Sequence, residues 1–177
     1  NRNILTITLK PHVSVDAFRM ERHFFTSASC GLCGKAALET VRVGDYPPLW
    51  ADGPLLTPER LWSLPRTLRQ AQTLFNETGG LHAAALFDAE GHLLALREDV
   101  GRHNALDKLI GHFLLEEKAA VLRRGIVLLS GRASFELVQK AAKAGIPVVA
   151  AVGAPSSLAV DLARECGMTL IGFLREG

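Results

Sequence analysis

The sequence GIVLLSGRASFELVQKAAKAGIPVVAAV, residues 125–152, contains two short apolar runs separated by a segment with helical spacing. Residues 125–129 and 147–152 predict strands, and their continuous apolar runs indicate burial on both faces of a sheet. The segment between them predicts a helix that runs to Ala144 and stops at Gly145. A strand, a helix and a strand in succession predict a parallel pair joined by a right-handed crossover.

The same alternation continues on both sides of this stretch. Residues 153–157, GAPSS, predict a turn into a helix that ends at Gly167, and residues 168–174 predict a last strand. Residues 81–87 and 92–97 flank the turn DAEG and predict an antiparallel hairpin. An amphipathic helix is predicted after it, through residue 113. We therefore expect an α/β fold, a three-layer α-β-α sandwich around a mixed, mainly parallel sheet.

The segment before the hairpin is less regular. Residues 57–59, TPE, predict the start of a helix, Pro65 is expected to interrupt or restart it, and residues 79–80, GG, are expected to end it. Residues 3–9 alternate apolar and polar and predict a strand, and residues 17–25 predict a second extended stretch. We expect residues 1–56 to form N-terminal strands and a mobile loop packed on an α/β core of residues 57–177, within a single domain overall.

Composition narrows the classes of function. The 177-residue chain is 48% hydrophobic, which is enough for a sizeable core, and its net charge of +2 gives no strong basic field for nucleic acid. No apolar run approaches the roughly 20 residues that a membrane-spanning helix needs, and no signal peptide is visible. Three cysteines, an odd number, argue against a secreted disulfide framework. We expect a protein of a reducing compartment, without nucleic-acid or membrane partners.

Residues 27–35, SASCGLCGK, place the thiols of Cys30 and Cys33 three residues apart and before Lys35. Such a pair can hold half of a zinc site, form a redox disulfide or carry sulfur as a persulfide. No second Cys or His pair completes a zinc site, and no strand leads directly into the pair as in thioredoxin. The surrounding glycines predict a mobile loop, and a nearby cation stabilises a thiolate. These features favour a cysteine that reaches out to a partner; a zinc site and an exposed loop with incidental cysteines stay open as alternatives.

Three loops that lead from strands to helices are predicted at one edge of the sheet, where parallel sheets bind their ligands. They are residues 99–104, 130–134 and 153–157, all rich in Gly, Ser or Arg. Each leads to a helix N-terminus that favours anions, and Arg102 and Arg132 add charge suited to phosphate. The loops predict a site for a phosphorylated ligand, or else these serines and glycines only cap helices.

Two histidines are open to a functional or a structural interpretation. His103 stands at a predicted helix start, either as a polar part of the site or as a surface residue. His82 lies in an apolar strand, which predicts an interior histidine rather than a ligand-binding one.

Four stretches carry a resemblance to a known family. They are SCGLCG at residues 29–34, TGGLHAAA at residues 78–85, EDVGRHNALDK at residues 98–108 and SGRASFE at residues 130–136. In these stretches the chain is similar to the FdhD family of formate dehydrogenase accessory sulfurtransferases. The resemblance spans nearly the whole chain, and residues 98–108 are its most specific part.

The resemblance implies a cytidine-deaminase-like core without deaminase activity, in a cytoplasmic homodimer. It also implies that the protein takes sulfur from a cysteine desulfurase as a persulfide. That sulfur would pass to the molybdenum or tungsten bis-pterin guanine dinucleotide cofactor, so that formate dehydrogenase becomes active. The cofactor would be bound as a substrate, and no zinc is expected.

Carried onto this sequence, the resemblance makes Cys30 the persulfide carrier and Cys33 its partner in relaying or releasing sulfur. The cofactor-binding stretch of the family falls on residues 173–177. Together with the predicted loops, the expected cofactor-binding residues are Arg102, His103, Ser130, Gly131, Arg132, Ser134, Gly153, Phe173, Leu174, Arg175, Glu176 and Gly177. Family members have a further N-terminal segment that this sequence lacks, and the sequence stops inside the cofactor-binding stretch. We therefore expect a chain that folds but lacks part of the site.

Two other classes of function stay open. One is a zinc-dependent, deaminase-like hydrolase, which stoichiometric zinc would indicate. The other is a binding protein that chaperones the cofactor to its enzyme without transferring sulfur, with Cys30 and Cys33 in a structural role.

Overall fold

The computed structural model describes residues 6, 8–14, 46 and 56–176. The chain divides into two compact units, residues 1–42 and residues 43–177, and the second contains the helices and strands given below. Residues 6 and 8–14 contain neither helix nor strand, so the strand predicted at residues 3–9 is not found in its described part. The stretch predicted at residues 17–25 lies outside the described residues, and the packing of residues 1–56 on the core stays a prediction.

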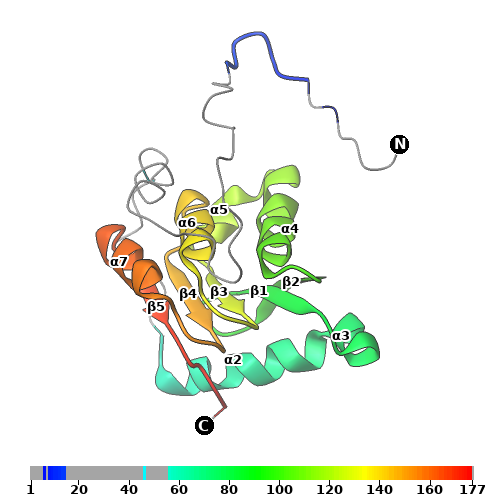
Figure 1. Cartoon of the computed structure of the whole chain (residues 1–177), viewed down its shortest axis with the longest axis vertical. Helices are drawn as coiled ribbons and strands as arrows, with labels where there is room; N and C mark the ends of the chain where they lie inside the picture. The colour runs from blue at the N-terminus through cyan, green and yellow to red at the C-terminus, as the bar shows by residue number, and fades with distance from the viewer. Residues whose placement is uncertain (1–5, 7, 15–45, 47–55, 177) are drawn as a thin grey trace. The chain divides into compact units, whose positions relative to one another are not determined.

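Within residues 56–176, five strands form one sheet in the order β2-β1-β3-β4-β5 (Figure 1). They are β1 (His82–Phe87), β2 (Leu93–Asp99), β3 (Ile126–Leu129), β4 (Val148–Ala151) and β5 (Thr169–Ile171). β1 pairs antiparallel with both β2 and β3, whereas β3 with β4 and β4 with β5 are parallel. The mixed sheet is confirmed. Its parallel pairs lie in the half of the sheet that contains β3 and β4, the strands predicted from residues 125–152.

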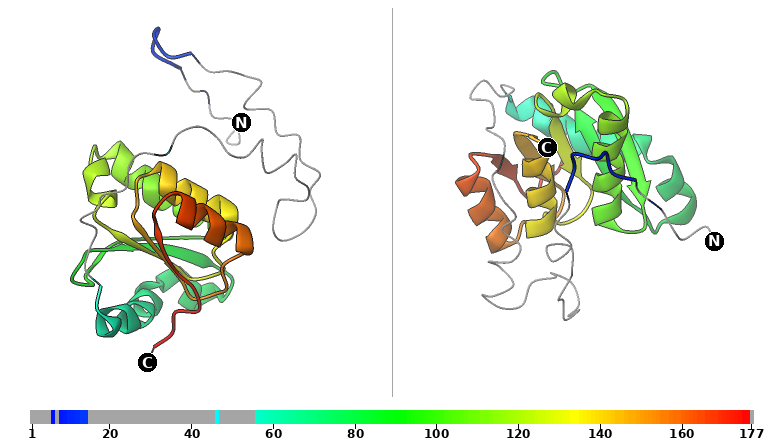
Figure 2. Two further views of the ribbon diagram at one scale, coloured as in Figure 1. Left: turned by 90° about the vertical axis from the view of Figure 1, so that its left-hand side faces the viewer. Right: turned by 90° about the horizontal axis from the view of Figure 1, so that it is seen from above.

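Helices cover both faces of the sheet. They are α2 (Pro58–Ala71), α3 (Thr73–Thr78), α4 (Arg102–Leu115), α5 (Ala119–Leu122), α6 (Phe135–Lys143) and α7 (Ser157–Glu165). Helices α2 and α3 lie on one face and α4, α6 and α7 on the other (Figure 1 and Figure 2). The three-layer α-β-α sandwich is therefore confirmed. Among the described residues, no helix combines the length and the apolar character needed to cross a bilayer.

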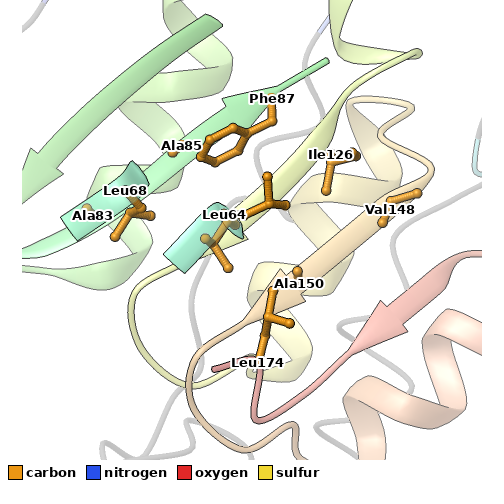
Figure 3. Close-up of a cluster of buried hydrophobic side chains, with 10 residues drawn as sticks. Leu64, Leu68, Ala83, Ala85, Phe87, Ile126, Val148, Ala150 and Leu174 are labelled. Atoms are coloured by element: carbon orange, nitrogen blue, oxygen red, sulfur yellow. The ribbon is translucent and has the colours of Figure 1, made fainter. Parts of the chain in front are cut away.

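One core lies between α2 and the sheet. Leu64 and Leu68 of α2 pack on alternate residues of the three central strands (Figure 3). The other buried members of this cluster are Ala83, Ala85, Phe87, Ile126, Leu128, Val148, Ala150 and Leu174. Successive strand residues point to opposite faces, so the intervening apolar residues, which are also buried, face α4, α6 and α7. The central strands are thus buried on both faces, as their uninterrupted apolar runs predict.

The interruption predicted at Pro65 is wrong. Helix α2 runs through Pro65 to Ala71, and the chain breaks instead at Gln72, where ψ is 80°. A proline removes one internal hydrogen bond, but Leu64 and Leu68 on either side of it are buried against the sheet, and this packing holds the helix together. Gly79 then ends α3 with φ of 66°, as predicted, and its N–H donates to the Phe75 carbonyl at 2.7 Å.

The last strand is shorter than predicted. β5 covers only Thr169–Ile171, because the backbone turns into the left-handed region at Phe173, where φ is 56°. The chain nevertheless stays beside β4. The Phe173 N–H donates to the Gly153 carbonyl at 3.1 Å, and the Leu174 N–H donates to the Ala151 carbonyl at 2.9 Å. The C-terminal residues are therefore fixed next to the loop that follows β4.

Candidate functional site

All five strands present one end at the same edge of the sheet. His82, which starts β1, pairs with Asp99, which ends β2, and Ala84 of β1 pairs with Leu129, which ends β3. Parallel pairing places the carboxyl ends of β4 and β5 beside that of β3 (Figure 1). The start of the antiparallel strand β1 therefore joins the carboxyl ends of the other four strands.

The three loops predicted at one edge of the sheet lie there. Two of them, residues 130–134 and 153–157, are joined through their backbones. The Gly153 N–H donates to the Gly131 carbonyl at 3.0 Å, and Ala133 pairs with Pro155 in an isolated parallel bridge. A side chain at Gly153 has no room, because a Cβ there would lie 2.9 Å from the backbone of Gly131. The edge thus has a floor of closely packed peptide groups.

We expect Gly153→Ala to separate these two loops, because backbone atoms on both sides cannot rotate away from the new methyl group. The free energy of unfolding should fall by about 1–3 kcal/mol, the usual cost of overpacking. Chemical denaturation measures this effect. The matched control is Gly111→Ala in α4, where a Cβ meets nothing within 4 Å and helix propensity favours alanine. Equal stability of the two variants would contradict the close packing of the loops.

Ser130 connects the loop after β3 to β1. Its Oγ accepts a hydrogen bond from the Ala83 N–H at 2.8 Å, and its own N–H donates to the Ala83 carbonyl at 3.0 Å. The hydroxyl proton of Ser130 remains available for a further acceptor. The next residue, Gly131, lies against the imidazole of His82, since a Cβ there would be 3.2 Å from Nδ1. His82 is half-buried at this edge rather than fully interior, so the prediction for it holds only in part.

A second polar group lies where α4 and α6 begin. The Nε2 atom of His103 is 2.9 Å from Oε2 of Glu136 and 3.3 Å from Oγ of Ser134, the buried N-cap residue of α6. Burial lowers the pKa of His103 and outweighs the Glu136 carboxylate, which raises it. At neutral pH the imidazole is therefore neutral, with Nε2–H directed to the carboxylate and Nδ1 able to accept a proton.

Asp99, at the end of β2, organises the start of α4. Its Oδ1 accepts from the Gly101 N–H at 2.9 Å and from Nδ2 of Asn104 at 3.1 Å, and its Oδ2 lies 2.5 Å from Nζ of Lys108. The hydrogen bond from Lys108, followed by that from Gly101, lowers the pKa of Asp99 to about 2. The carboxylate thus holds the first two turns of α4 in place.

This lowered pKa predicts how stability depends on pH. The folded-state pKa of Asp99 lies below the unfolded value of 3.8, so its contribution is complete above pH 4 and disappears as the pH falls through about 2. We expect Asp99→Asn to be less stable than wild type at pH 7, and the difference to shrink between about pH 4 and pH 2. Urea denaturation across this range measures it. The control is Asp161→Asn on the exposed side of α7, which should change stability little at any pH.

Glu98, near the end of β2, binds the first turn of α3 through its side chain. Its Oε1 accepts from the Phe75 N–H at 2.9 Å and its Oε2 from the Leu74 N–H at 3.0 Å. These are free N–H groups of the first turn of α3, which has no capping side chain of its own. Glu98 and Asp99 together fix α3 and α4 on opposite faces of the sheet. Residues 98–108 therefore have a positioning role that local spacing did not predict.

A cavity of about 570 Å³ opens at this edge on the α2 and α3 side. It is bounded by the last turn of α2, by α3, by residues 79–82 and by the ends of β3 and β4. Its polar lining comes from Arg69, Gln72, His82 and Ser130. The cavity has the size of a small-molecule site, about 300–1,000 Å³. Of the described residues that were predicted to bind the cofactor, Ser130 alone lines it.

The sequence model of the FdhD/NarQ family matches residues 2–177. The chain belongs to this family. A sulfur carrier protein FdhD of Streptomyces avermitilis is 55% identical over 179 residues, covering 98% of this chain and 61% of the relative. Another from Saccharolobus solfataricus is 43% identical over 173 residues, covering 98% of this chain and 63% of the relative. The chain thus spans about three fifths of the length of these curated relatives.

A solved structure supports the fold of this FdhD/NarQ family member. The crystal structure of a protein from Desulfotalea psychrophila, described as a formate dehydrogenase accessory protein, aligns with a TM-score of 0.65 and 34% identity. The alignment covers 75% of this chain and 55% of that one. The α/β sandwich is therefore shared with a relative of known structure.

The residues predicted to bind the cofactor, from the three loops and from the FdhD resemblance, are distributed over the edge of the sheet. Gly131 and Gly153 form its floor, Ser130 faces the cavity, and Arg132 is exposed. Arg102, His103 and Ser134 lie on the α4 and α6 side. Cys30, Cys33 and Gly177 lie outside the described residues. Ser130 lies both at the edge of the sheet and in the lining of the cavity. His103, with Glu136 and Ser134, lies on the other face of the sheet.

The C-terminal stretch divides into two kinds of residue. Phe173 and Arg175 are exposed beside the loop after β4, and Glu176 forms an ion pair with Arg66 at 3.1 Å. Leu174 is 6% exposed and belongs to the core beneath α2 (Figure 3). Its side chain packs in the core, and its assignment to the cofactor-binding stretch stays a prediction.

Proposed function

We propose that the protein is a sulfur carrier that takes a persulfide sulfur on Cys30 and delivers it to the molybdenum bis-pterin guanine dinucleotide cofactor of formate dehydrogenase. The observation that carries this proposal is the identity of 43–55% with proteins named sulfur carrier protein FdhD, over 98% of this chain. The Cys30 and Cys33 pair supplies a suitable thiol and a second one three residues away. A cysteine desulfurase and formate dehydrogenase are the proposed partners, and the proposed assembly is a homodimer in the cytoplasm.

The loading step is a thiol–persulfide exchange. The Cys30 thiolate attacks the outer sulfur of a persulfide on the desulfurase, a new S–S bond forms on Cys30, and the bond on the donor breaks. The donor cysteine leaves as a thiolate. No oxidant is needed, because the sulfur moves in the oxidation state in which the donor holds it. Lys35 follows the pair in sequence and favours the thiolate form.

The release step uses the second thiol. The Cys33 thiolate attacks the inner sulfur of the Cys30 persulfide, which forms a Cys30–Cys33 disulfide and expels hydrosulfide. The two thiols supply the two electrons that reduce the transferred sulfur. The hydrosulfide replaces an oxygen ligand on the metal, which leaves with protons as water. A dithiol reductant of the thioredoxin class then restores both thiols for the next cycle.

The acceptor is a large anionic ligand, and the edge of the sheet has features that suit one. Arg132 and Arg175 are exposed there, and the closely packed loops of Gly131 and Gly153 let a ligand approach the backbone. Guanidinium groups bind phosphate oxygens in a bidentate geometry. These features support binding of a dinucleotide with its phosphates along the edge.

Mass spectrometry after incubation with a cysteine desulfurase and cysteine tests the proposal. We expect one added sulfur on the peptide that contains Cys30, removed again by a dithiol reductant. Cys166 serves as the internal control: it is half-buried at the end of α7, and burial raises the pKa of its thiol, so it should stay unmodified. Sulfur found on Cys166 but not on Cys30 would overturn the assignment, and stoichiometric zinc with no added sulfur would favour a hydrolase.

A further inference from the structure

Helix α3 is weakly anchored compared with helix α2, which precedes it. None of its six residues is buried, and Leu74 is 50% exposed, whereas Leu64 and Leu68 of α2 are 1% and 2% exposed. A helix this short is unstable by itself in water and depends on contacts with the rest of the protein. Helix α3 nevertheless forms one wall of the cavity, to which it contributes Phe75 and its C-cap residue Gly79. The contacts that hold α3 therefore decide whether this wall is fixed.

Side chains from two other elements hold α3. Glu98 of β2 accepts hydrogen bonds from the N–H groups of Leu74 and Phe75, at 3.0 Å and 2.9 Å. Arg69 of α2 donates a hydrogen bond to Oδ1 of Asn76, and its guanidinium lies 4.7 Å from the centre of the Phe75 ring. Arg69 is exposed, so its contacts compete with water, whereas Glu98 is half-buried and its carboxylate makes charge-assisted hydrogen bonds. Within residues 56–176, Glu98 thus supplies the stronger polar contacts that α3 makes outside its own turns.

Glu98 is itself fixed to the sheet. It pairs with Ala83 of β1, and its backbone carbonyl accepts a hydrogen bond from Nζ of Lys108 at 3.2 Å. Its side chain lies on the same face as that of Ala83, the face that α2 and α3 cover (Figure 1). A movement of α3 would therefore break the two hydrogen bonds to Glu98 and leave the sheet unchanged.

The backbone leaves the helical conformation at both ends of α3. Gln72, before it, has ψ of 80°, and Gly79, after it, has φ of 66° and is followed by Gly80. A Cβ at Gly79 would meet nothing within 4 Å, so the chain has room to move there. Hinges are a few residues at the ends of an element that absorb a change in backbone angles, and these residues have that place. Because α3 buries no side chain, turning it outwards exposes little apolar surface.

We propose that α3 is a hinged lid on the cavity and that Glu98 is the latch that holds it closed. Breaking the hydrogen bonds from Leu74 and Phe75 lets α3 turn about Gln72 and Gly79, which widens the mouth of the cavity. A lid of this kind controls when a ligand enters and leaves. Its opening depends neither on the identity of the ligand nor on sulfur transfer, so it can be measured apart from the proposed function.

Hydrogen exchange of the full chain, followed by NMR or mass spectrometry, tests the movement. We expect the amides of residues 74–79 to exchange together by local opening, faster than those of β1 and almost independently of low urea concentrations. Glu98→Gln keeps the shape of the side chain but removes its charge and one of the two acceptor oxygens. It should speed exchange in α3 about tenfold to hundredfold and leave exchange in β1 unchanged. The matched control is Glu77→Gln, the same substitution at an exposed residue of α3, which should exchange like wild type.

Two results of this experiment would reject the proposal. Exchange in α3 that is as slow as in β1, with the same dependence on urea, would mean that α3 opens only when the whole fold unfolds. Equal exchange rates in Glu98→Gln and Glu77→Gln would reject Glu98 as the latch.

A thiol placed in the cavity tests whether the movement of α3 controls access. Val152, which follows β4, lines the cavity, and Val152→Cys keeps a similar volume. A bulky maleimide should label this cysteine about tenfold faster when Glu98→Gln is added, and at the unchanged rate when Glu77→Gln is added. Peptide mass spectrometry locates the label, and thermal unfolding verifies that each variant stays folded. Equal labelling rates would mean that α3 moves without opening the cavity, and would reject the lid.

Discussion

Cys30→Ser is expected to take up no sulfur from a cysteine desulfurase and to give no active formate dehydrogenase. A serine hydroxyl cannot form a persulfide, so the later steps have no sulfur to transfer. Cys33→Ser should behave differently. It keeps the accepting thiol but lacks the group that expels hydrosulfide, so it should accumulate the persulfide and release almost none of it. Loading and release thus depend on different cysteines.

Mass spectrometry measures the loading, and formate dehydrogenase activity measures the transfer. Cys166→Ser serves as the control and should match wild type in both, because that thiol is half-buried and its pKa is raised. Full maturation of formate dehydrogenase by Cys30→Ser would reject the carrier role. Full maturation by Cys33→Ser would show instead that the acceptor or another thiol reduces the persulfide.

Phe87→Ala is expected to cause the largest loss of stability of any substitution discussed. The Phe87 ring has no exposed surface and lies beneath α2, beside Ile126 in the neighbouring strand (Figure 3). Removing it loses the burial of the ring and leaves a void that strands on both sides cannot close. The free energy of unfolding should fall by about 3–5 kcal/mol, as found for aromatic truncation in cores.

Urea denaturation at neutral pH measures this loss. Phe173→Ala is the matched control, because it removes the same ring from a position that is 62% exposed. We expect a change of under about 0.5 kcal/mol for it, as is usual for surface substitutions. Similar losses in the two variants would mean that the core beneath α2 does not contribute as its burial indicates.

The elements that hydrophobic spacing and glycine define could be predicted from the sequence. The buried strands of residues 125–152, the hairpin before them and the stop at Gly79 all follow from local patterns. The continuation of α2 through Pro65 could not, because it depends on Leu64 and Leu68 meeting the sheet. The short last strand depends on the left-handed backbone conformation of Phe173, which is uncommon for phenylalanine and which the sequence does not indicate.

The location of the candidate site at this edge of the sheet could be predicted, since strand order and loop composition determine it. The contacts between its side chains could not be predicted. Glu98 reaches the first turn of α3, and Glu136 reaches His103, between elements far apart in the sequence. The cavity arises only when α2, α3 and the ends of β3 and β4 come together in the fold. The roles of Cys30 and Cys33 stay predictions, because those residues lie outside the described part of the chain.

The contact between Gly131 and Gly153 has a consequence for how specificity can change in this protein. Where two loops meet with no space for a methyl group, any ligand encounters bare peptide, whatever residues surround it. The backbone atoms of this surface are closely packed, so binding there requires little further ordering of the protein. A change in the ligand bound at this edge would have to act through the side chains around these peptide groups, while the peptide groups themselves remain the same.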